Sequence, residues 1–183
     1  MVARRTGDIS VLLAYFFVMP KLFLIRHAIA EDREVFGKSG LPDDQRPLTE
    51  DGRSKMQKIA KKLFLQEPDI KIFYQSPLVR SQQTVDVLKE HYKKATVKTL
   101  KSLSPGSPTE DLLKDLQQQP PQEMALIGHE NHISQCLTFL LTGTTEPNPF
   151  LFKKGGIACL EYSKIQAGVF KLKWLVPPKV FLA

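Results

Sequence analysis

Four side chains that can bind an anion follow three short apolar runs of the sequence, three of them at the end of a run and Arg80 in the first turn of the next predicted helix. They are Arg26, His27, Arg80 and His129. Each apolar run is typical of a buried strand, and ligands of open α/β sheets bind beyond the carboxyl ends of the strands. Helix N-termini at that edge direct backbone N–H groups inward, and arginine forks match phosphate oxygens in bidentate geometry. The sequence therefore predicts a site for a dianion, and a phosphoryl group fits best.

Other chemistries are less well supported by these residues. His129 and His132 stand three residues apart, which is not the i, i+4 spacing of HExxH, and no third ligand stands out, so a metal site is disfavoured. The sequence contains no GxxxxGK[ST], GxGxxG or GxSxG motif. P-loop, dinucleotide-binding and hydrolase-elbow functions are therefore not indicated. We expect neither a metal nor another cofactor.

Apolar runs alternate with segments of helical periodicity from residue 21 to the C-terminus. The runs predicted to be strands are KLFLIR (21–26), KIFY (71–74), residues 96–100, EMALIG (123–128), residues 157–162 and residues 169–176. The predicted helices follow Thr49 as N-cap, follow Ser76 with Pro77 at the first helical position, and occupy the regions around 112–116 and 133–141. This alternation predicts an α/β sandwich around a mostly parallel sheet.

The charge of the chain is unevenly distributed. The 183 residues carry a formal charge of +7, with 42% apolar and 25% charged residues, which excludes a disordered or fibrous class. Six lysines against one glutamate give residues 153–183 a charge of +5, so the rest of the chain is nearly neutral. Lys171 and Lys173 alternate with apolar residues, as on the solvated face of a strand. We therefore expect no nucleic-acid partner.

Residues 1–18 are expected to be an N-terminal extension, with residues 19–183 as a single domain. Their two arginines and apolar run resemble a signal peptide, but the run is shorter than the roughly 20 residues of a membrane span. No small-x-small cleavage site follows it, and Met19 stands before the first strand, so we expect no stable membrane insertion. Cys136 and Cys159 form neither a disulfide framework nor a zinc pattern and are typical of reduced core residues in a cytoplasmic protein.

Several motifs resemble those of the histidine phosphatase superfamily. They are LIRHA (24–28), QRPLTEDGR (45–53), SPLVRSQQT (76–84), GHE (128–130) and KKGGIACLEY (153–162). The resemblance is closest to the SixA-type phosphohistidine phosphatases and spans about residues 20–176. Ala28 stands where the wider family has glycine. The resemblance implies a three-layer α/β/α sandwich with a mixed, mostly parallel sheet, as in phosphoglycerate mutase.

The resemblance also implies a metal-independent phosphatase that works through a phosphohistidine intermediate. It assigns the nucleophile to His27. It assigns the phosphate pocket to Arg26, Arg80 and His129, with Arg46 as a further substrate contact. Water then hydrolyses the phosphohistidine, and the arginines supply the positive charge that the reaction needs. The implied substrate and partner is a phosphorylated protein, such as a histidine phosphotransfer domain bearing phosphohistidine.

The proton donor for the leaving group is not marked in the sequence. Glu110 and Asp111 are weak candidates, because acids in the first turn of a predicted helix equally stabilise the helix dipole. An imidazole leaving group protonates at about pH 6.5, so solvent can supply its proton, whereas an alkoxide leaving group needs the acid more. A carboxylate facing the pocket would favour the alternative of a small-molecule phosphomonoesterase. A non-catalytic phospho-ligand binding module is the other alternative, and it would bind without turnover.

Overall fold

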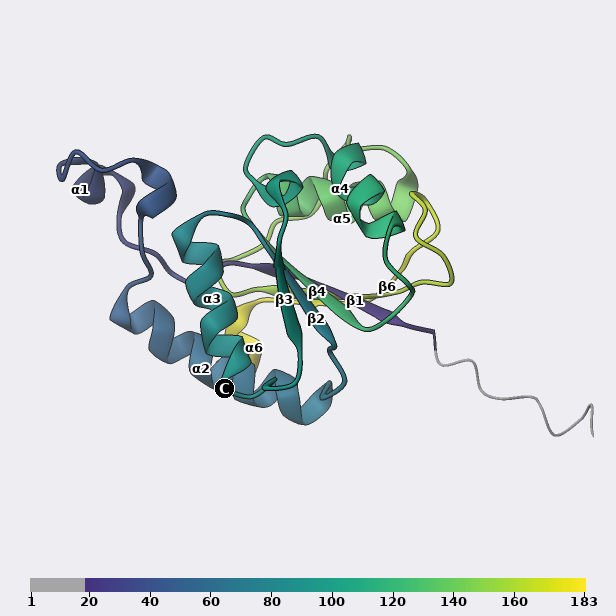
Figure 1. The fold of residues 1–183 in the computed structure, drawn as a ribbon, viewed down its shortest axis with the longest axis horizontal. Coiled ribbons are helices and arrows are strands. Elements are labelled where there is room, and N and C mark those ends of the chain that lie inside the picture. The colour runs from purple at the N-terminus through teal and green to yellow at the C-terminus, as the bar shows by residue number, and fades with distance from the viewer. Residues whose placement is uncertain (1–18) are drawn as a thin grey trace, which may run out of the picture.

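The fold is a six-stranded sheet with helices on both faces (Figure 1). The computed structural model describes residues 19–183, and the expected extension over residues 1–18 lies outside the described residues. The strands are β1 (Lys21–Arg26), β2 (Ile72–Gln75), β3 (Thr96–Thr99), β4 (Met124–Gly128), β5 (Ile157–Glu161) and β6 (Lys171–Val176). The α-helices are α1 (Arg33–Gly37), α2 (Glu50–Gln66), α3 (Val79–Lys89), α4 (Thr109–Gln117), α5 (His132–Thr142) and α6 (Pro178–Leu182). The 3₁₀ helices are η2 (Asp43–Gln45) and η3 (Lys101–Leu103).

The sheet is mixed and mainly parallel, which confirms the predicted fold class. Its strand order is β3-β2-β4-β1-β5-β6. The first four strands of this order are parallel to one another, whereas β5 is antiparallel to both β1 and β6. The register of the parallel pair β1 and β4 sets Arg26 beside Gly128. The residues that follow these two strands, His27 and His129, therefore leave the sheet side by side.

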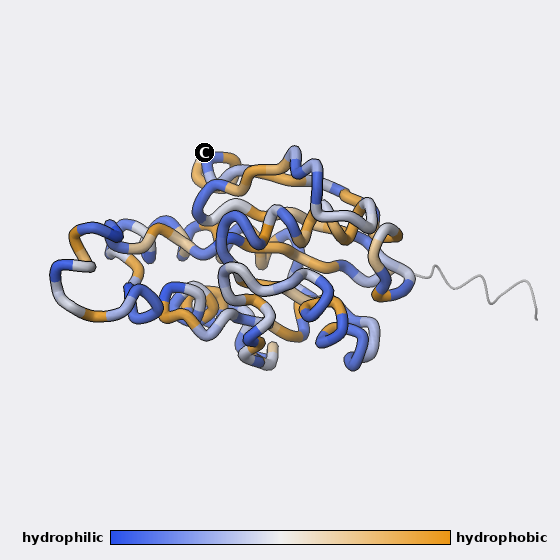
Figure 2. The backbone as a smooth tube through the Cα atoms, turned by 90° about the horizontal axis from the view of Figure 1, so that it is seen from above, coloured by the Kyte–Doolittle hydropathy of each residue, from blue (hydrophilic) through white to orange (hydrophobic). Residues whose placement is uncertain are grey.

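Two apolar layers enclose the sheet. Helices α2, α3 and α6 cover one face, while α4 and α5 cover the other (Figure 1). Within β1, Phe23 and Ile25 pack in the first layer and Leu22 and Leu24 pack in the second. Because both faces of this strand are buried, its sequence is apolar without interruption from Leu22 to Ile25. Figure 2 shows this apolar character concentrated along the strands. Among residues 19–183, no helix combines the length and apolar character needed to cross a membrane.

Helix α2 fixes the loop that follows β1. The Thr49 hydroxyl caps the helix by accepting a hydrogen bond from the Gly52 amide at 2.9 Å, as its N-cap role predicts. A Cβ at Gly52 would lie only 2.0 Å from the backbone oxygen of Ile29. Glycine is therefore required at this position for the first turn of α2 to pack against the loop that carries His27.

The start of α3 differs from its prediction. The helix begins at Val79 with Leu78 as N-cap, two residues later than a helix with Pro77 at its first position. Ser76 does not cap it, because its hydroxyl accepts from the Leu78 amide at 3.3 Å and pairs with His129. The short helices α1 and α6 were not predicted from the sequence. At the far edge, Lys171 and Lys173 of β6 are exposed as expected, but Leu172 between them is exposed as well, so this end of the strand does not alternate between a buried and a solvated face.

Candidate active site

A cavity of about 280 Å³ opens at the carboxyl ends of β1, β2 and β4. We call it the carboxyl-edge cavity. Its lining residues are Arg26, His27, Glu31, Asp32, Arg33, Arg46, Arg80, Pro105, His129, Glu130 and Lys154. The structure thus brings all five residues that were singled out from the sequence to one cavity. Nearly every side chain that lines it is charged or titratable, which suits a strongly charged ligand.

The ring of His27 is held in one tautomer by the backbone. Its Nδ1 lies 2.7 Å from the carbonyl oxygen of Ala28. A carbonyl can only accept, so Nδ1 carries the proton and Nε2 keeps a free lone pair. The pKa of His27 is lowered to about 3, mainly by burial and then by the positive charges of Arg80 and Arg26, against the Ala28 hydrogen bond that raises it. His27 is therefore neutral and nucleophilic at physiological pH.

His129 lies against His27 and presents an unused polar atom. The two rings are 5.0 Å apart between centroids, and Nε2 of His129 is 2.8 Å from the hydroxyl of Ser76. This hydroxyl accepts from the Leu78 amide, so its own proton can go to Nε2, which leaves Nδ1 as an N–H donor. That Nδ1 is buried and has no partner among the described residues. Burial, followed by the electrostatic effect of a proton on the His27 ring and by the positive charge of Arg80, lowers the pKa of His129 to about 2.

Arg26 and Arg80 line the cavity, and each has a further buried donor without a partner among the described residues. Nη1 of Arg26 donates to the carbonyl of Phe152 at 2.5 Å. Nη1 of Arg80 donates to the carbonyl of Asp43 at 2.8 Å. The Nε atoms of both arginines are buried without a partner among residues 19–183. Burial lowers the pKa of each guanidinium, yet arginine stays charged in proteins. Buried donors without partners call for an explanation, and an oxyanion in the cavity would supply the missing acceptors.

Asp43 was missed by sequence reasoning although it pairs with three of the cavity's arginines, Arg46, Arg80 and the exposed Arg33. Its Oδ1 accepts from Nε of Arg46 at 2.8 Å, and its Oδ2 is 3.2 Å from Nη2 of Arg80. Partial burial raises the pKa of Asp43, but the hydrogen bond from Arg46 and the charge of Arg80 outweigh it, so the net pKa is lowered. No motif marks Asp43 for this role; its position three residues before Arg46 is the only available signal.

Thr84 joins the nucleophile's loop to α3. Its hydroxyl accepts from the amide of Ala28 at 3.1 Å and donates to the carbonyl of Arg80 at 2.7 Å. The loop after β1 and the first turn of α3 are therefore tied together through one buried side chain. This link fixes the distance between the His27 segment and the Arg80 segment. Thr84 belongs to the SPLVRSQQT motif, but the sequence alone did not single it out.

Some of the acidic residues near the carboxyl-edge cavity line it, and others lie on the protein surface. Glu110 and Asp111, the weak candidates for a proton donor, are exposed and do not line the cavity. Asp111 instead pairs with Lys114 at 2.9 Å on the surface of α4. Glu130, directly after His129, does line the cavity, and its Oε2 is buried without a partner among the described residues. Sequence reasoning quoted Glu130 within the GHE motif and assigned it no role.

His132 is kept apart from the cavity. Its ring is buried beside the thiol of Cys136, with Nε2 3.5 Å from Sγ. Burial lowers the pKa of His132 and raises that of Cys136, so both are neutral. Within residues 19–183, no group of three or more His, Cys, Asp or Glu side chains could hold a metal ion. His129 and His132 thus face different surroundings.

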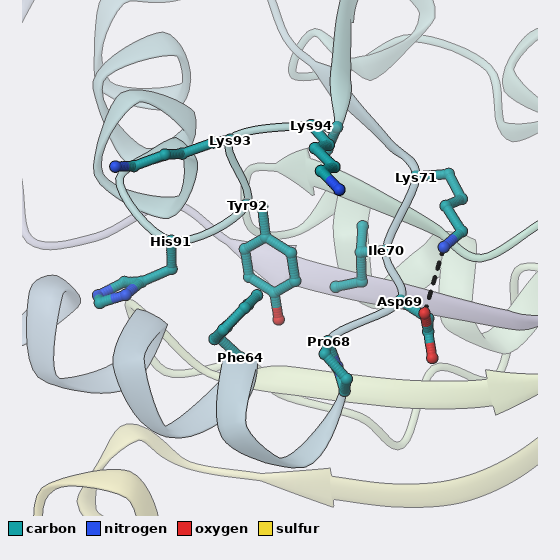
Figure 3. A pocket seen from close by; sticks show the side chains of 10 residues that line it. Phe64, Pro68, Asp69, Ile70, Lys71, His91, Tyr92, Lys93 and Lys94 are labelled. Atoms are coloured by element: carbon teal, nitrogen blue, oxygen red, sulfur yellow. Dashed lines mark hydrogen bonds and ion pairs between the residues drawn. The ribbon is translucent and has the colours of Figure 1, made fainter.

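A second cavity, of about 400 Å³, lies at the opposite end of the sheet, and Figure 3 shows the side chains that line it. We call it the amino-edge cavity, because Lys71 and Ala95, among its lining residues, stand directly before β2 and β3. Its other lining residues are Phe64, Pro68, Asp69, Ile70, His91, Tyr92, Lys93 and Lys94. Aromatic and aliphatic side chains dominate it, and Lys71 pairs with Asp69 at 3.2 Å.

Comparisons with known proteins show which family the chain resembles over most of its length. The family model of the histidine phosphatase superfamily (branch 1) matches residues 22–130. An uncharacterized protein of Picosynechococcus sp. is 28% identical over 169 residues, which cover 86% of this chain and 99% of the relative.

Solved structures share the fold at lower identity. The protein histidine phosphatase SixA, complexed with tungstate, superposes with a TM-score of 0.74 at 21% identity, covering 87% of this chain and 98% of SixA. A phosphoserine phosphatase of Entamoeba histolytica gives 0.63 at 15% identity, covering 90% of this chain and all of that one. The family match spans more than half of the chain and includes His27, Arg46, Arg80 and His129. The chain therefore belongs to the histidine phosphatase superfamily (branch 1) and is a phosphatase of that superfamily.

Proposed function

We propose that this protein is a metal-independent phosphatase that transfers the phosphoryl group of its substrate to Nε2 of His27 and then hydrolyses it. The observation that carries the proposal is the hydrogen bond from Nδ1 of His27 to the Ala28 carbonyl. It keeps the second ring nitrogen unprotonated, as a nucleophile requires. The lowered pKa of His27 keeps the ring neutral over the working pH range of most enzymes.

The surrounding cations suit the transferring phosphoryl group. Catalysis of phosphoryl transfer consists mainly of positioning the group and neutralising charge on its equatorial oxygens. The unpaired Nε–H groups of Arg26 and Arg80 and the free Nδ1–H of His129 are the donors for these oxygens. Arg46 adds positive charge from the side of η2. After transfer, a water molecule attacks phosphorus, the N–P bond breaks, and His27 is restored.

We further propose that the substrate is phosphohistidine, or another phosphorylated residue, on a protein. The carboxyl-edge cavity is small and charged, and Pro105 is the one apolar residue among those that line it within residues 19–183. A small metabolite would find little apolar surface to bind beyond its phosphoryl group, whereas a protein can contact the surface outside the cavity. The likeness in fold to the protein histidine phosphatase SixA, itself complexed with the oxyanion tungstate, supports this substrate class.

A trapping experiment tests the proposed function. The protein is incubated with a phosphohistidine-bearing protein and, separately, with nitrophenyl phosphate, with and without EDTA, and is then quenched in alkali. We expect acid-labile phosphate on His27 and turnover that EDTA leaves unchanged. His27→Ala should lose both, and His91→Ala, in the amino-edge cavity, should lose neither. If no substrate labels His27 and the wild type turns over no faster than His27→Ala, the mechanism is wrong.

A further inference from the structure

A further cavity, of about 190 Å³, lies next to the loop that carries His27. We call it the α6 cavity, because α6, which packs against α2 (Figure 1), forms one of its walls. Its apolar lining residues are Ala28, Ile29, Met56, Ile59, Pro178 and Leu182. Sites for drug-sized ligands hold roughly 300–1,000 Å³, so the α6 cavity takes only a small molecule.

The charged side chains that line the α6 cavity are all lysines. They are Lys55, Lys154 and Lys179, and within residues 19–183 no acidic residue lines the cavity. Lys55 pairs with Asp51 at 2.7 Å, whereas Lys154 and Lys179 form no ion pair with any described residue. Apolar walls beside two unpaired ammonium groups fit a small anion that carries an apolar chain.

The kind of anion follows from the kind of cation. Arginine forks, which match the oxygens of a phosphoryl group, line the carboxyl-edge cavity but not the α6 cavity. Lysine offers a compact point charge instead, and this suits the single charge of a carboxylate. The amino-edge cavity is less suited to such a ligand, because Asp69 lines it and pairs with Lys71 at 3.2 Å. An alkyl carboxylate is therefore the ligand class that the α6 cavity fits best.

Lys154 belongs to both the α6 cavity and the carboxyl-edge cavity. The pKa of its ammonium group is lowered, first by burial and then by the positive charges of Arg26 and Arg46, with Asp32 acting in the opposite direction. The amide of the next residue, Gly155, donates to the carbonyl of Arg26 at 3.1 Å, which holds the Lys154 segment beside the end of β1. An anion that pairs with Lys154 in one cavity therefore leaves less positive charge for an anion in the other.

We infer that the α6 cavity binds a small alkyl carboxylate, and that this ligand weakens the binding of phosphate in the carboxyl-edge cavity because both anions draw on Lys154. The alkyl chain lies against Met56 and Leu182, and the carboxylate lies between the ammonium groups of Lys154 and Lys179. Coupling between two binding sites is reciprocal, so phosphate weakens the binding of the carboxylate by the same factor. The inference goes beyond the proposed function, since it requires phosphate to bind but requires no turnover.

Isothermal titration calorimetry on the full chain tests both parts of the inference. The ligands are octanoate, acetate and octylammonium, followed by inorganic phosphate with and without saturating octanoate. We expect octanoate to bind, and acetate and octylammonium to bind at least about tenfold more weakly, since acetate lacks the alkyl chain and octylammonium is repelled by the lysines. Saturating octanoate should lower the affinity for inorganic phosphate by about fivefold or more.

Variants of the cavity wall and of the shared lysine locate the ligand. Leu182→Ser should lower the affinity for octanoate by about tenfold, because the apolar wall is lost. Val180→Ser is the matched control, since Val180 is exposed on the same helix and does not line the cavity, and it should bind octanoate as wild type does. Lys154→Gln should bind octanoate more weakly and should make phosphate affinity independent of octanoate. Lys94→Gln, at the amino edge, should change neither affinity.

The opposite results would overturn the inference. They are no binding of octanoate, equal binding of octanoate and octylammonium, or wild-type affinity for octanoate in Leu182→Ser. Octanoate that binds without changing phosphate affinity would contradict the coupling through Lys154, and octanoate that excludes phosphate completely would place both anions in one cavity. None of these outcomes affects the proposed function, which depends on the labelling of His27.

Discussion

The carboxyl-edge and amino-edge cavities lie at opposite ends of the same sheet and differ in how their polar groups are satisfied. The amino-edge cavity is the larger, at about 400 Å³ against about 280 Å³. Its one buried phenol, Tyr92, donates to the carbonyl of Glu67 at 2.9 Å, and its lysines are exposed. In the carboxyl-edge cavity, buried nitrogen atoms of Arg26, Arg80 and His129 are left without partners among the described residues.

This difference identifies the site better than size does. A buried donor without a partner costs about 1–3 kcal/mol, and at the carboxyl edge several such groups lie together where one ligand can complete them. The amino-edge cavity has no comparable need, because its polar groups are paired or in water. We therefore expect substitutions at the carboxyl edge to change activity and substitutions at the amino edge to change stability alone.

The largest expected contrast is between the histidines of the two cavities. His27→Ala removes the nucleophile and should lower kcat by about 10⁴-fold or more, while circular dichroism and the unfolding midpoint show the fold retained. His91→Ala, at the amino edge, should keep full activity. Turnover rates of both variants on nitrophenyl phosphate test this contrast. Substantial turnover by His27→Ala, or a comparable loss in His91→Ala, would remove the functional distinction between the cavities.

Acid sensitivity should also belong to the carboxyl-edge cavity. In the folded chain the pKa of His27 is about 3, whereas in the unfolded chain it is near about 6.5. The unfolded state therefore binds more protons between these values, and the stability contributed by the neutral ring is lost as pH falls from 6.5 toward 3. The loss is about 1.4 kcal/mol per pH unit for one such group, and His129, with its pKa near 2, acts in the same direction.

Urea unfolding at pH 6.5 and pH 4.5 measures this dependence. The free energy of unfolding of wild type should fall between the two values, and His27→Gln, which has no titrating ring, should fall by less. His91→Gln is the matched variant at the amino edge and should follow wild type. Equal pH dependence in all three proteins would show that His27 is not held neutral by its surroundings.

The arginine fork provides the next contrast. Arg80→Lys keeps the charge and loses the planar set of donors, including the unpaired Nε–H. We expect kcat/KM to fall by about 10²-fold, the loss typical of removing one donor to a transition-state oxyanion. Lys94→Ala removes a whole charge from the amino-edge cavity and should not change kcat/KM. If Arg80→Lys retained wild-type activity, positive charge alone would suffice for the site.

Asp43 should contribute less, because it acts through the arginines. Asp43→Asn keeps the shape of the side chain but weakens the bonds to Arg46 and Arg80. A hydrogen bond between charged groups is worth about 1.5–3 kcal/mol, so we expect kcat/KM to fall about tenfold. Asp43→Glu should restore part of the loss, and the pH dependence of kcat should keep its wild-type form. Failure of glutamate to recover any activity would argue against positioning by a carboxylate.

The strand-following residues explain why much of the site could be predicted from the sequence. Residues directly behind parallel strands must meet at one edge of the sheet, so Arg26, His27 and His129 could be brought together without a structure. The apolar runs also predicted the sheet, since strands buried on both faces are apolar throughout. The family resemblance then supplied the expected role of each residue.

Contacts between distant loops could not be predicted in the same way. Asp43 lies on a 3₁₀ helix with no periodicity or motif, and its bond to Arg80 spans 37 residues. Ser76 was expected to cap α3, but its hydroxyl forms a hydrogen bond with the ring of His129, 53 residues away. Glu130 stands in a quoted motif, yet only the fold shows its carboxyl beside the cavity. Side-chain pairing across loops depends on tertiary geometry, which local propensity does not encode.

The smallest expected effect is a loss of stability on substitution of Tyr92 in the amino-edge cavity. Tyr92→Phe deletes the hydroxyl that donates to the Glu67 carbonyl and leaves in place the edge-on contact of the ring with Phe73. The free energy of unfolding should fall by about 1 kcal/mol, the net value of one such hydrogen bond. Activity should be unchanged, because the phenol lies at the end of the sheet opposite His27. Urea unfolding and nitrophenyl phosphate turnover, measured on the same preparation, test both expectations. If Tyr92→Phe had normal stability and a reduced kcat, the amino-edge cavity would be energetically coupled to the active site. The distinction between one cavity that serves catalysis and another that serves only packing would then be wrong.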